Sequence, residues 1–192
     1  MSDKVMENGE VDGLIDEIAQ LRSKVADLQA RVEQLDQLAH QDTLIDLPNR
    51  RGFMRALEQL IDRVGRYQSR GAMLFVDLDG LKIINDTFGH GAGDEALIQV
   101  ASLLSKGVRR SDVVARIGGD EFGILLENSS EERAHETAAR LIALICASEL
   151  IYEGDALPLS VAIGVSLIGA SDTPETVIAR ADEEMYRRKA AA

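Results

Sequence analysis

The chain has 192 residues, of which 45% are hydrophobic and 28% are charged, and its formal net charge is −12. This length suits one domain with an appendage, and the hydrophobic content is sufficient for a buried core. A strongly acidic chain lacks the basic face that a sequence-independent nucleic-acid binder needs, so we expect no nucleic-acid polymer as a partner.

The single cysteine, Cys146, lies in the apolar stretch LIALICA, and we expect it to be a core residue of a protein from a reducing compartment. No apolar run is long enough to span a bilayer, and the first ten residues, MSDKVMENGE, are too polar for a signal peptide. The sequence therefore predicts a soluble, cytoplasmic protein with no membrane insertion.

Residues 1–40 carry a heptad repeat. β-Branched residues occupy every position a and leucine every position d: Val11, Leu14, Ile18, Leu21, Val25, Leu28, Val32 and Leu35. This combination favours a parallel two-stranded coiled coil, in which Glu17 would face Arg22 of the partner helix and Arg31 would face Asp36. The alternative is an amphipathic helix packed on its own domain, but the narrow apolar stripe favours the coiled coil. We therefore predict that this helix joins two chains.

Residues 41–192 form a second unit, of roughly 150 residues, in which predicted helices and strands alternate. In chain order we expect a helix over 50–67, a strand over 72–78, helices over 81–88 and 93–108, strands over 112–117 and 121–127, a helix over 130–150, a strand over 157–168 and a helix over 173–190. Asn49 and Thr173 are the predicted N-caps of the first and last helices. Gly118 and Gly119 separate two strands and suit a hairpin turn with positive φ. The expected fold is an α/β sandwich: a mixed sheet with one hairpin and helices on its faces.

Acidic residues flank two of the predicted strands. Asp77 and Asp79 end the first strand, and Asp120 and Glu121 begin the third. If both strands are central, Asp77 and Asp120 meet at one edge of the sheet, where close carboxylates repel each other unless a cation lies between them. Hard oxygen ligands and few imidazoles point to magnesium. The same acids could instead be solvated loop ends, and pattern alone does not decide between the two.

Three separated motifs carry a resemblance to a known family. They are GGDEF at 118–122, DLDGLKIINDTFGHGAGD at 77–94 and DTLIDLPNRRGF at 42–53. In this order and spacing they resemble the GGDEF family of diguanylate cyclases, over residues 42–189. The resemblance implies a palm-like nucleotidyl cyclase fold that condenses two GTP molecules into cyclic di-GMP and releases pyrophosphate. The sequence departs from the family at Leu81, where phenylalanine is common, and at Asp46, where glycine is common.

The resemblance also implies a metal site. Asp77 and Asp120 would hold two Mg²⁺ ions, or Mn²⁺, with the carbonyl of Leu78 as a further ligand. The metals would lower the pKa of a ribose 3′-hydroxyl and neutralise charge around the α-phosphate. Glu121 would help to remove the 3′-hydroxyl proton.

Substrate-binding residues follow from the same resemblance. Asn85 and Asp94 match the positions that recognise guanine, and a carboxylate can accept both N–H groups of its Watson–Crick edge. Asp94 could also stabilise the first turn of its helix. Lys82 and Lys189 match phosphate-contacting lysines, and the glycine pair at 118–119 lets the backbone approach the nucleotide.

The stretch RRSD at 109–112 places an RxxD motif five residues before the glycine pair. This is the spacing of the family's product-binding inhibitory site, and arginine suits both guanine and phosphate. A second arginine usually comes from another element, for which Arg140 is the candidate. The resemblance therefore implies inhibition by cyclic di-GMP through Arg109 and Asp112, although an exposed charged turn is the default for such a motif.

One domain binds one GTP, so the reaction requires a homodimer with facing sites, which the coiled coil would supply. The alternative is a catalytically silent GGDEF module that binds GTP or cyclic di-GMP and signals through its coil. The intact metal and guanine positions argue against this alternative. A polymerase or adenylyl cyclase of related fold is disfavoured by the guanine-type pair and the acidic charge.

Overall fold

The structure is a computed structural model that describes residues 17, 18, 20–32, 36 and 39–190. Contacts divide the chain into two compact units, the first ending at Ala39 and the second beginning at His40. Among the described residues, no helix combines the length and the apolar character needed to cross a lipid bilayer.

In the first unit, residues 20–32 are helical. Apolar side chains at the heptad positions of this unit are exposed to solvent: Ile18, Leu21, Val25, Leu28 and Val32, with exposed fractions of 49% to 64%. The predicted heptad residues Val11, Leu14 and Leu35 lie outside the described residues. The single chain therefore leaves a stripe of branched apolar side chains in water.

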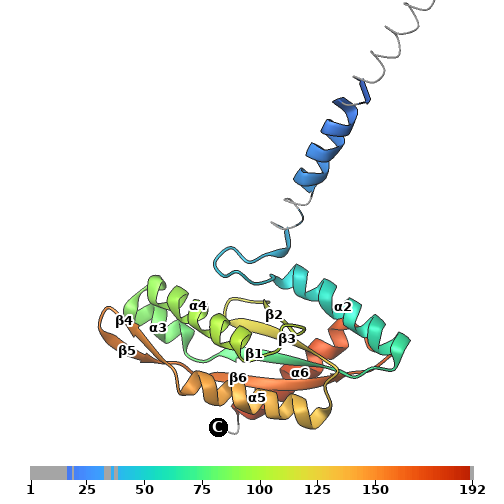
Figure 1. Cartoon of the computed structure of the whole chain (residues 1–192). Helices are drawn as coiled ribbons and strands as arrows, with labels where there is room; N and C mark the ends of the chain where they lie inside the picture. The colour runs from blue at the N-terminus through green and yellow to red at the C-terminus, as the bar shows by residue number, and fades with distance from the viewer. Residues whose placement is uncertain (1–16, 19, 33–35, 37–38, 191–192) are drawn as a thin grey trace, which may run out of the picture. The chain divides into compact units, whose positions relative to one another are not determined.

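The second unit contains eleven elements among the described residues. They are α2 (Arg50–Tyr67), β1 (Gly71–Leu78), α3 (Leu81–Phe88), α4 (His90–Lys106), β2 (Val113–Arg116), β3 (Glu121–Glu127), α5 (Glu131–Cys146), β4 (Glu149–Tyr152), β5 (Asp155–Pro158), β6 (Val161–Ile168) and α6 (Pro174–Lys189) (Figure 1). The caps of the first and last helices form as the sequence predicts. Asn49 accepts hydrogen bonds from the N–H groups of Arg51 and Gly52 at 2.9 and 3.1 Å, and Thr173 accepts from Thr176 at 3.4 Å.

The main sheet has the strand order β2-β3-β1-β6, and every neighbouring pair is antiparallel. The predicted mixed sheet is therefore wrong, although the helices and strands do make an α/β sandwich. β1 and β2 run in the same direction, as expected for strands joined through α3 and α4. They never pair, because β3 folds back between them and places β1 at the centre of the sheet.

A second, two-stranded sheet was not predicted from the sequence. The helix expected over 130–150 ends at Cys146, and the chain continues into the antiparallel β4–β5 hairpin. Its turn consists of Glu153 and Gly154, with φ of 51° and 98°. The hairpin projects beyond the main sheet beside α4 (Figure 1), where Gln99 Nε2 donates to the carbonyl oxygen of Glu149 at 3.1 Å.

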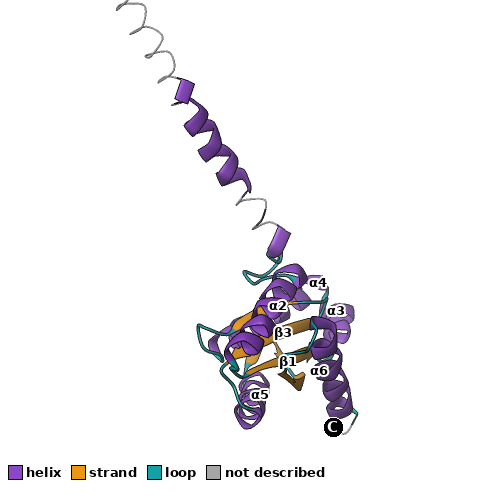
Figure 2. Cartoon of the chain, turned by 90° about the vertical axis from the view of Figure 1, so that its right-hand side faces the viewer, coloured by secondary structure: helices purple, strands orange, loops and turns teal. Residues whose placement is uncertain are grey.

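The core lies on both faces of the main sheet, which the helices enclose (Figure 2). Alternating side chains of β1 serve the two faces, as the period of a strand requires. Leu74 and Val76 pack in a cluster with α4 and α5, whereas Met73 and Phe75 pack in a cluster with α2 and α6. β1 is therefore buried on both sides, and its polar residues are restricted to its end.

Cys146 is exposed, and the prediction that it belongs to the core is wrong. The buried positions of α5 are Ala134, Ala138, Leu141 and Ile145. Cys146 comes one residue after the last of these, about 100° further round the helix, so it faces away from the sheet.

Candidate active site

Backbone pairing brings three acidic residues to one end of the main sheet. Asp77 of β1 lies directly opposite Glu121 of β3 in the strand register. The next N–H group along β1, that of Leu78, donates to the carbonyl oxygen of Asp120 at 2.9 Å. Asp77, Asp120 and Glu121 therefore gather where the two central strands meet, and none of the three is fully buried.

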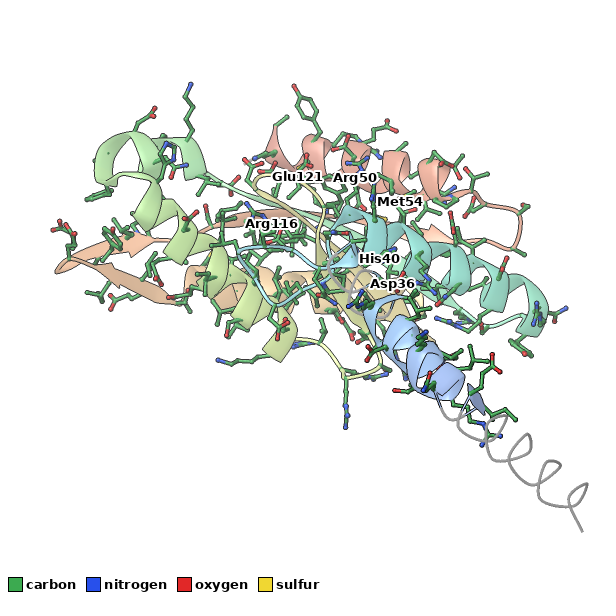
Figure 3. All side chains as sticks on the ribbon, turned by 90° about the horizontal axis from the view of Figure 1, so that it is seen from above. Asp36, His40, Arg50, Met54, Arg116 and Glu121 are labelled. Carbon is green, nitrogen blue, oxygen red and sulfur yellow. The ribbon has the colours of Figure 1, made fainter. Side chains whose placement is uncertain are left out.

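The electrostatics of this cluster are unfavourable. Burial raises the pKa of Glu121 above its ordinary value, and the charges of Asp120 and Asp77 raise it further, with Arg50 opposing them. Arg50 and Glu121 line one pocket at the start of α2, and both are marked in Figure 3. Like charges opposed across a strand pair are destabilising unless a cation separates them, so the site fits a positively charged group.

Lys189 supplies positive charge from the last residue of α6. Its ammonium group contacts the carboxylates of Asp77 and Asp79, the second at 3.1 Å. Partial burial lowers the pKa of Lys189, but the hydrogen bonds to these two carboxylates outweigh it and raise the pKa above its ordinary value. Asp79 is held in turn by Ser160, whose Oγ donates to it at 3.0 Å. Ser160 is a site contact that sequence reasoning missed, because it lies 81 residues further along the chain.

Within the described part of the chain, no three acidic, histidine or cysteine side chains are placed to enclose a metal ion by themselves. Mg²⁺ is usually held by one or two carboxylates together with water and substrate phosphates. The pair Asp77 and Asp120, with the adjacent carbonyl of Leu78, has the donor chemistry for such an open site. The excess negative charge around Glu121 is a second feature that fits a cation here.

The glycine pair of the β2–β3 turn does not adopt positive φ, so that prediction is wrong. Among the described glycines, positive φ occurs at Gly80, Gly89 and Gly154. The turn is closed by the N–H groups of Ile117 and Gly118, which donate to the carbonyl oxygen of Glu121 at 2.9 and 3.2 Å. A Cβ at Gly118 would lie 2.1 Å from Glu121 Oε2, whereas one at Gly119 would meet nothing within 4 Å. Gly118 therefore makes room for the Glu121 side chain.

Arg116 ties this turn to the start of the domain, and its role was not found from the sequence. One guanidinium nitrogen donates to the carbonyl oxygen of Gly119 at 2.7 Å, and the other lies 3.3 Å from Asp42 Oδ1. Asp42 Oδ1 also accepts the N–H groups of Leu44 and Ile45 at 2.9 and 3.0 Å. Arg116, labelled in Figure 3, thus contacts a carbonyl oxygen of its own turn and a carboxylate 74 residues away in the sequence.

The predicted guanine residues lie on two adjacent helices. Asn85 of α3 is packed against α4 so closely that a Cβ at Gly93 would lie 2.0 Å from Asn85 Oδ1. This oxygen is buried and has no hydrogen-bond partner. Asp94 is exposed on α4 but lies beyond its first turn, which begins at His90, so the predicted first-turn role is wrong. Lys82 is exposed in the first turn of α3.

The RxxD residues line a separate cavity of about 440 Å³ between the β2–β3 side of the sheet and α5. Asp112 accepts the N–H groups of Arg109 and Glu127 at 2.9 and 3.2 Å. Arg140 lines the same cavity, and so does Arg133, which was not predicted. A spacing of seven residues puts these two arginines on one face of α5, a signal that the sequence does contain.

The domain is an α/β sandwich that carries a cluster of acidic residues at one end of its central strand pair. Residues 39–192 match the family model described as "Diguanylate cyclase, GGDEF domain", and the chain belongs to this family. It is 37% identical over 166 residues to the probable diguanylate cyclase DgcE of Escherichia coli K12, covering 86% of this chain and 15% of DgcE. It is 34% identical over 186 residues to the diguanylate cyclase DgcP of Pseudomonas aeruginosa, covering 96% of this chain and 27% of DgcP. The chain thus spans less than a third of either relative.

Solved structures share the fold. The GGDEF domain of TpbB from Pseudomonas aeruginosa is 36% identical, with a TM-score of 0.75 and coverage of 80% of this chain and 90% of that one. The coiled coil and GGDEF domain of DgcB from Caulobacter crescentus, solved in complex with c-di-GMP, is 23% identical. Its TM-score is 0.85, and the match covers 93% of this chain and 95% of that one, which is a likeness in fold.

Replacing Glu121 by glutamine should stabilise the metal-free protein at neutral pH. Because the pKa of Glu121 is raised in the folded protein, protonation of this side chain favours the folded state. Its contribution to the free energy of unfolding is complete below the ordinary pKa of 4.5 and is lost as pH rises through the raised value. Above that value the charged side chain destabilises the site. Since water screens much of this repulsion, we expect a gain below about 1 kcal/mol.

Thermal unfolding in a metal chelator checks this expectation. The advantage of Glu121→Gln should shrink as pH is lowered towards 4.5, and Mg²⁺ should reduce it at neutral pH. Glu58→Gln, a change of the same charge at an exposed position of α2, is the matched control. Equal melting temperatures for Glu121→Gln and the unchanged protein at every pH would contradict the prediction.

Proposed function

We propose that this protein is a diguanylate cyclase, which condenses two GTP molecules into cyclic di-GMP and releases two pyrophosphates. The observation that carries the proposal is the convergence of Asp77, Asp120 and Glu121 at the junction of β1 and β3, next to a lysine at the end of α6. Membership of the GGDEF family supports the assignment. A carboxylate cluster with an adjacent cation suits phosphoryl transfer, in which positioning and charge neutralisation provide most of the catalysis.

The residues of the cluster divide the chemistry between them. Asp77, Asp120 and the Leu78 carbonyl would hold Mg²⁺ or Mn²⁺, which when bound lowers the pKa of the 3′-hydroxyl and neutralises charge at the α-phosphate. Glu121 accepts the 3′-hydroxyl proton, a role that a raised pKa favours. Lys189 contacts the triphosphate after it leaves Asp77 and Asp79, and Lys82 approaches the phosphates from α3.

Guanine is recognised between α3 and α4. The Asp94 carboxylate accepts N–H groups from the Watson–Crick edge of guanine, and Asn85 contacts the same base. A buried Asn85 Oδ1 without a partner supports this role, because a ligand donor would satisfy it. Adenine lacks the two adjacent N–H donors, so it would leave polar groups unpaired.

Two copies of the chain are needed, because each domain holds one GTP and the two must face each other. A parallel coiled coil of the first unit joins the copies in this proposal. Its support is the exposed apolar stripe at the heptad positions and the likeness in fold to a coiled coil joined to a GGDEF domain.

Cyclic di-GMP inhibits the enzyme at the RxxD cavity. Arg109, Arg133 and Arg140 line this cavity together with Asp112. Guanidinium groups bind phosphate and stack on bases, and a carboxylate can accept guanine N–H groups, so the lining matches a negatively charged guanine dinucleotide.

Incubation of the pure protein with GTP and Mg²⁺ should yield one cyclic di-GMP for every two pyrophosphates. Asp120→Asn should lower the rate at least about a hundredfold, because loss of a metal ligand removes several kcal/mol of transition-state stabilisation. Asp46→Asn, the same change at an exposed acid, is the control. GTP binding without product would instead indicate a catalytically silent module.

Charges placed in the apolar stripe should separate the two copies. The double change Leu21→Glu and Leu28→Glu should lower specific activity at least about tenfold at low protein concentration, with recovery as concentration rises. Ser23→Glu with Ala30→Glu, at the outward heptad positions, should have little effect. The oligomeric state is measured by light scattering, and equal activity of both double variants at every concentration would reject the coiled coil.

Arg109→Ala should relieve product inhibition. Loss of one charge-assisted contact to cyclic di-GMP should raise the inhibitory concentration about tenfold or more, with initial rates unchanged. Arg110→Ala removes an adjacent exposed arginine that does not line the cavity, and it should inhibit normally. An inhibition curve that does not move in Arg109→Ala would show that the cavity is not the inhibitory site.

A further inference from the structure

We propose that Tyr152 of the β4–β5 hairpin is a positioning residue for guanine recognition, acting on the start of α4 through Gly91. The inference rests on the proposed function, because it concerns how accurately Asp94 is placed for the base. Tyr152 lies in β4, which is separated from α4 by three other elements in the chain.

The contact between Tyr152 and Gly91 is very close. A Cβ built at Gly91 would lie 2.7 Å from the Tyr152 hydroxyl oxygen, and the next nearest atom is the ring carbon Cζ at 3.8 Å. A distance of 2.7 Å is too short for a methyl group, so a side chain at Gly91 would force either the tyrosine or the helix turn to shift. The Tyr152 ring is half-buried and packs against the core, which limits how far it can move away.

The hairpin follows one face of α4. Tyr152 meets Gly91 in the first turn, and Glu149 accepts a hydrogen bond from Gln99, eight residues further along the helix. Residues eight apart lie on the same helix face, about 12 Å from each other, which matches the length of the four-residue strand β4. β4 therefore runs alongside α4, and Tyr152 lies at the end of β4 nearest to Asn85 and Asp94, the residues proposed to bind guanine.

The beginning of α4 depends on this support. Its N-cap is Gly89, which has φ of 85° and offers no side chain to cap the helix. Two side chains from other elements press on the first turn instead: Asn85 at Gly93 and Tyr152 at Gly91. Asp94 follows immediately, so a shift of the first turn would move its carboxylate relative to Asn85 and to the base between them.

A purely structural role for Tyr152 is the competing explanation. Leu150 and Leu157 of the same hairpin are buried in the core, so the hairpin contributes to folding in any case. The two roles differ in what they affect. A folding role changes stability, whereas a positioning role changes the preference for guanine at constant stability.

The test is a double-mutant cycle on Gly91→Ala and Tyr152→Phe in the full chain, with equilibrium binding of GTP and ITP measured by calorimetry. ITP lacks the 2-amino group, so the ratio of the two affinities reports contact with that edge of the base. Gly91→Ala should weaken GTP binding on the order of tenfold and reduce the GTP preference, because the new methyl displaces the first turn. Tyr152→Phe alone removes the hydroxyl that supports the first turn, so it should also reduce the GTP preference. In the double variant the new methyl lies 3.8 Å from Cζ, an ordinary contact that replaces the lost one, so binding should recover to within about threefold.

Gly65→Ala is the matched control, because it is another helical glycine whose added Cβ would make an ordinary contact at 3.5 Å. Melting temperatures of all variants are measured to check that each is folded. The inference is overturned if either single variant keeps the full GTP preference, or if the double variant fails to regain it. If the unchanged protein binds GTP no better than ITP, the proposed function itself fails, whatever the variants do.

Discussion

Repulsion between carboxylates at the end of β1 is the constraint on which the site depends. Asp77 faces Glu121 across the central strand pair, and Asp120 stands beside them, so this end of the sheet cannot be stable without positive charge. In the structure the charge comes from Lys189, which α6 delivers to Asp77 and Asp79. α6 can reach because it packs directly on β6, where a Cβ at Gly164 would lie 2.0 Å from a helix carbonyl oxygen. A lysine ammonium and a metal ion are both cations, so the excess negative charge that holds Lys189 is also what suits this site to the metal ion of the proposed function.

A second positive charge holds the turn that carries two of these acids. Arg116 joins the carbonyl of Gly119 to Asp42, and Asp42 organises the turn at the start of the domain. The position of the GGDEF turn is therefore set from outside the sheet as well as by strand pairing. The other two guanidinium nitrogens make these contacts, whereas the buried Arg116 Nε atom has no hydrogen-bond partner. The two bonds of Arg116 place the turn and the domain start in one connected unit.

The sequence predicted what depends on neighbouring residues. α2 and α6 begin where Asn49 and Thr173 cap them, since a cap acts within one helical turn. Prediction from the sequence failed where segments distant in the chain determine which strands pair and where a helix ends. The insertion of β3 beside β1 makes the sheet antiparallel, and packing against α4 converts the end of an expected helix into the β4–β5 hairpin. The acids of the site were found because they flank strands, whereas Arg116 was missed because its partner lies 74 residues away.

The glycines of the motifs illustrate the same limit. A glycine pair between strands suggests positive φ, but Gly118 is needed because Glu121 fills the space where its side chain would be. The same relation recurs at Gly93 beneath Asn85 and at Gly91 beneath Tyr152. In each case a polar side chain packs on the glycine, and it comes either from another segment or from the opposite side of the same turn. A sequence shows the glycine but not the side chain that packs against it, because the two are brought together only by tertiary packing. Glycine-rich motifs in this domain therefore mark places where a polar side chain packs closely on the backbone, as well as turns.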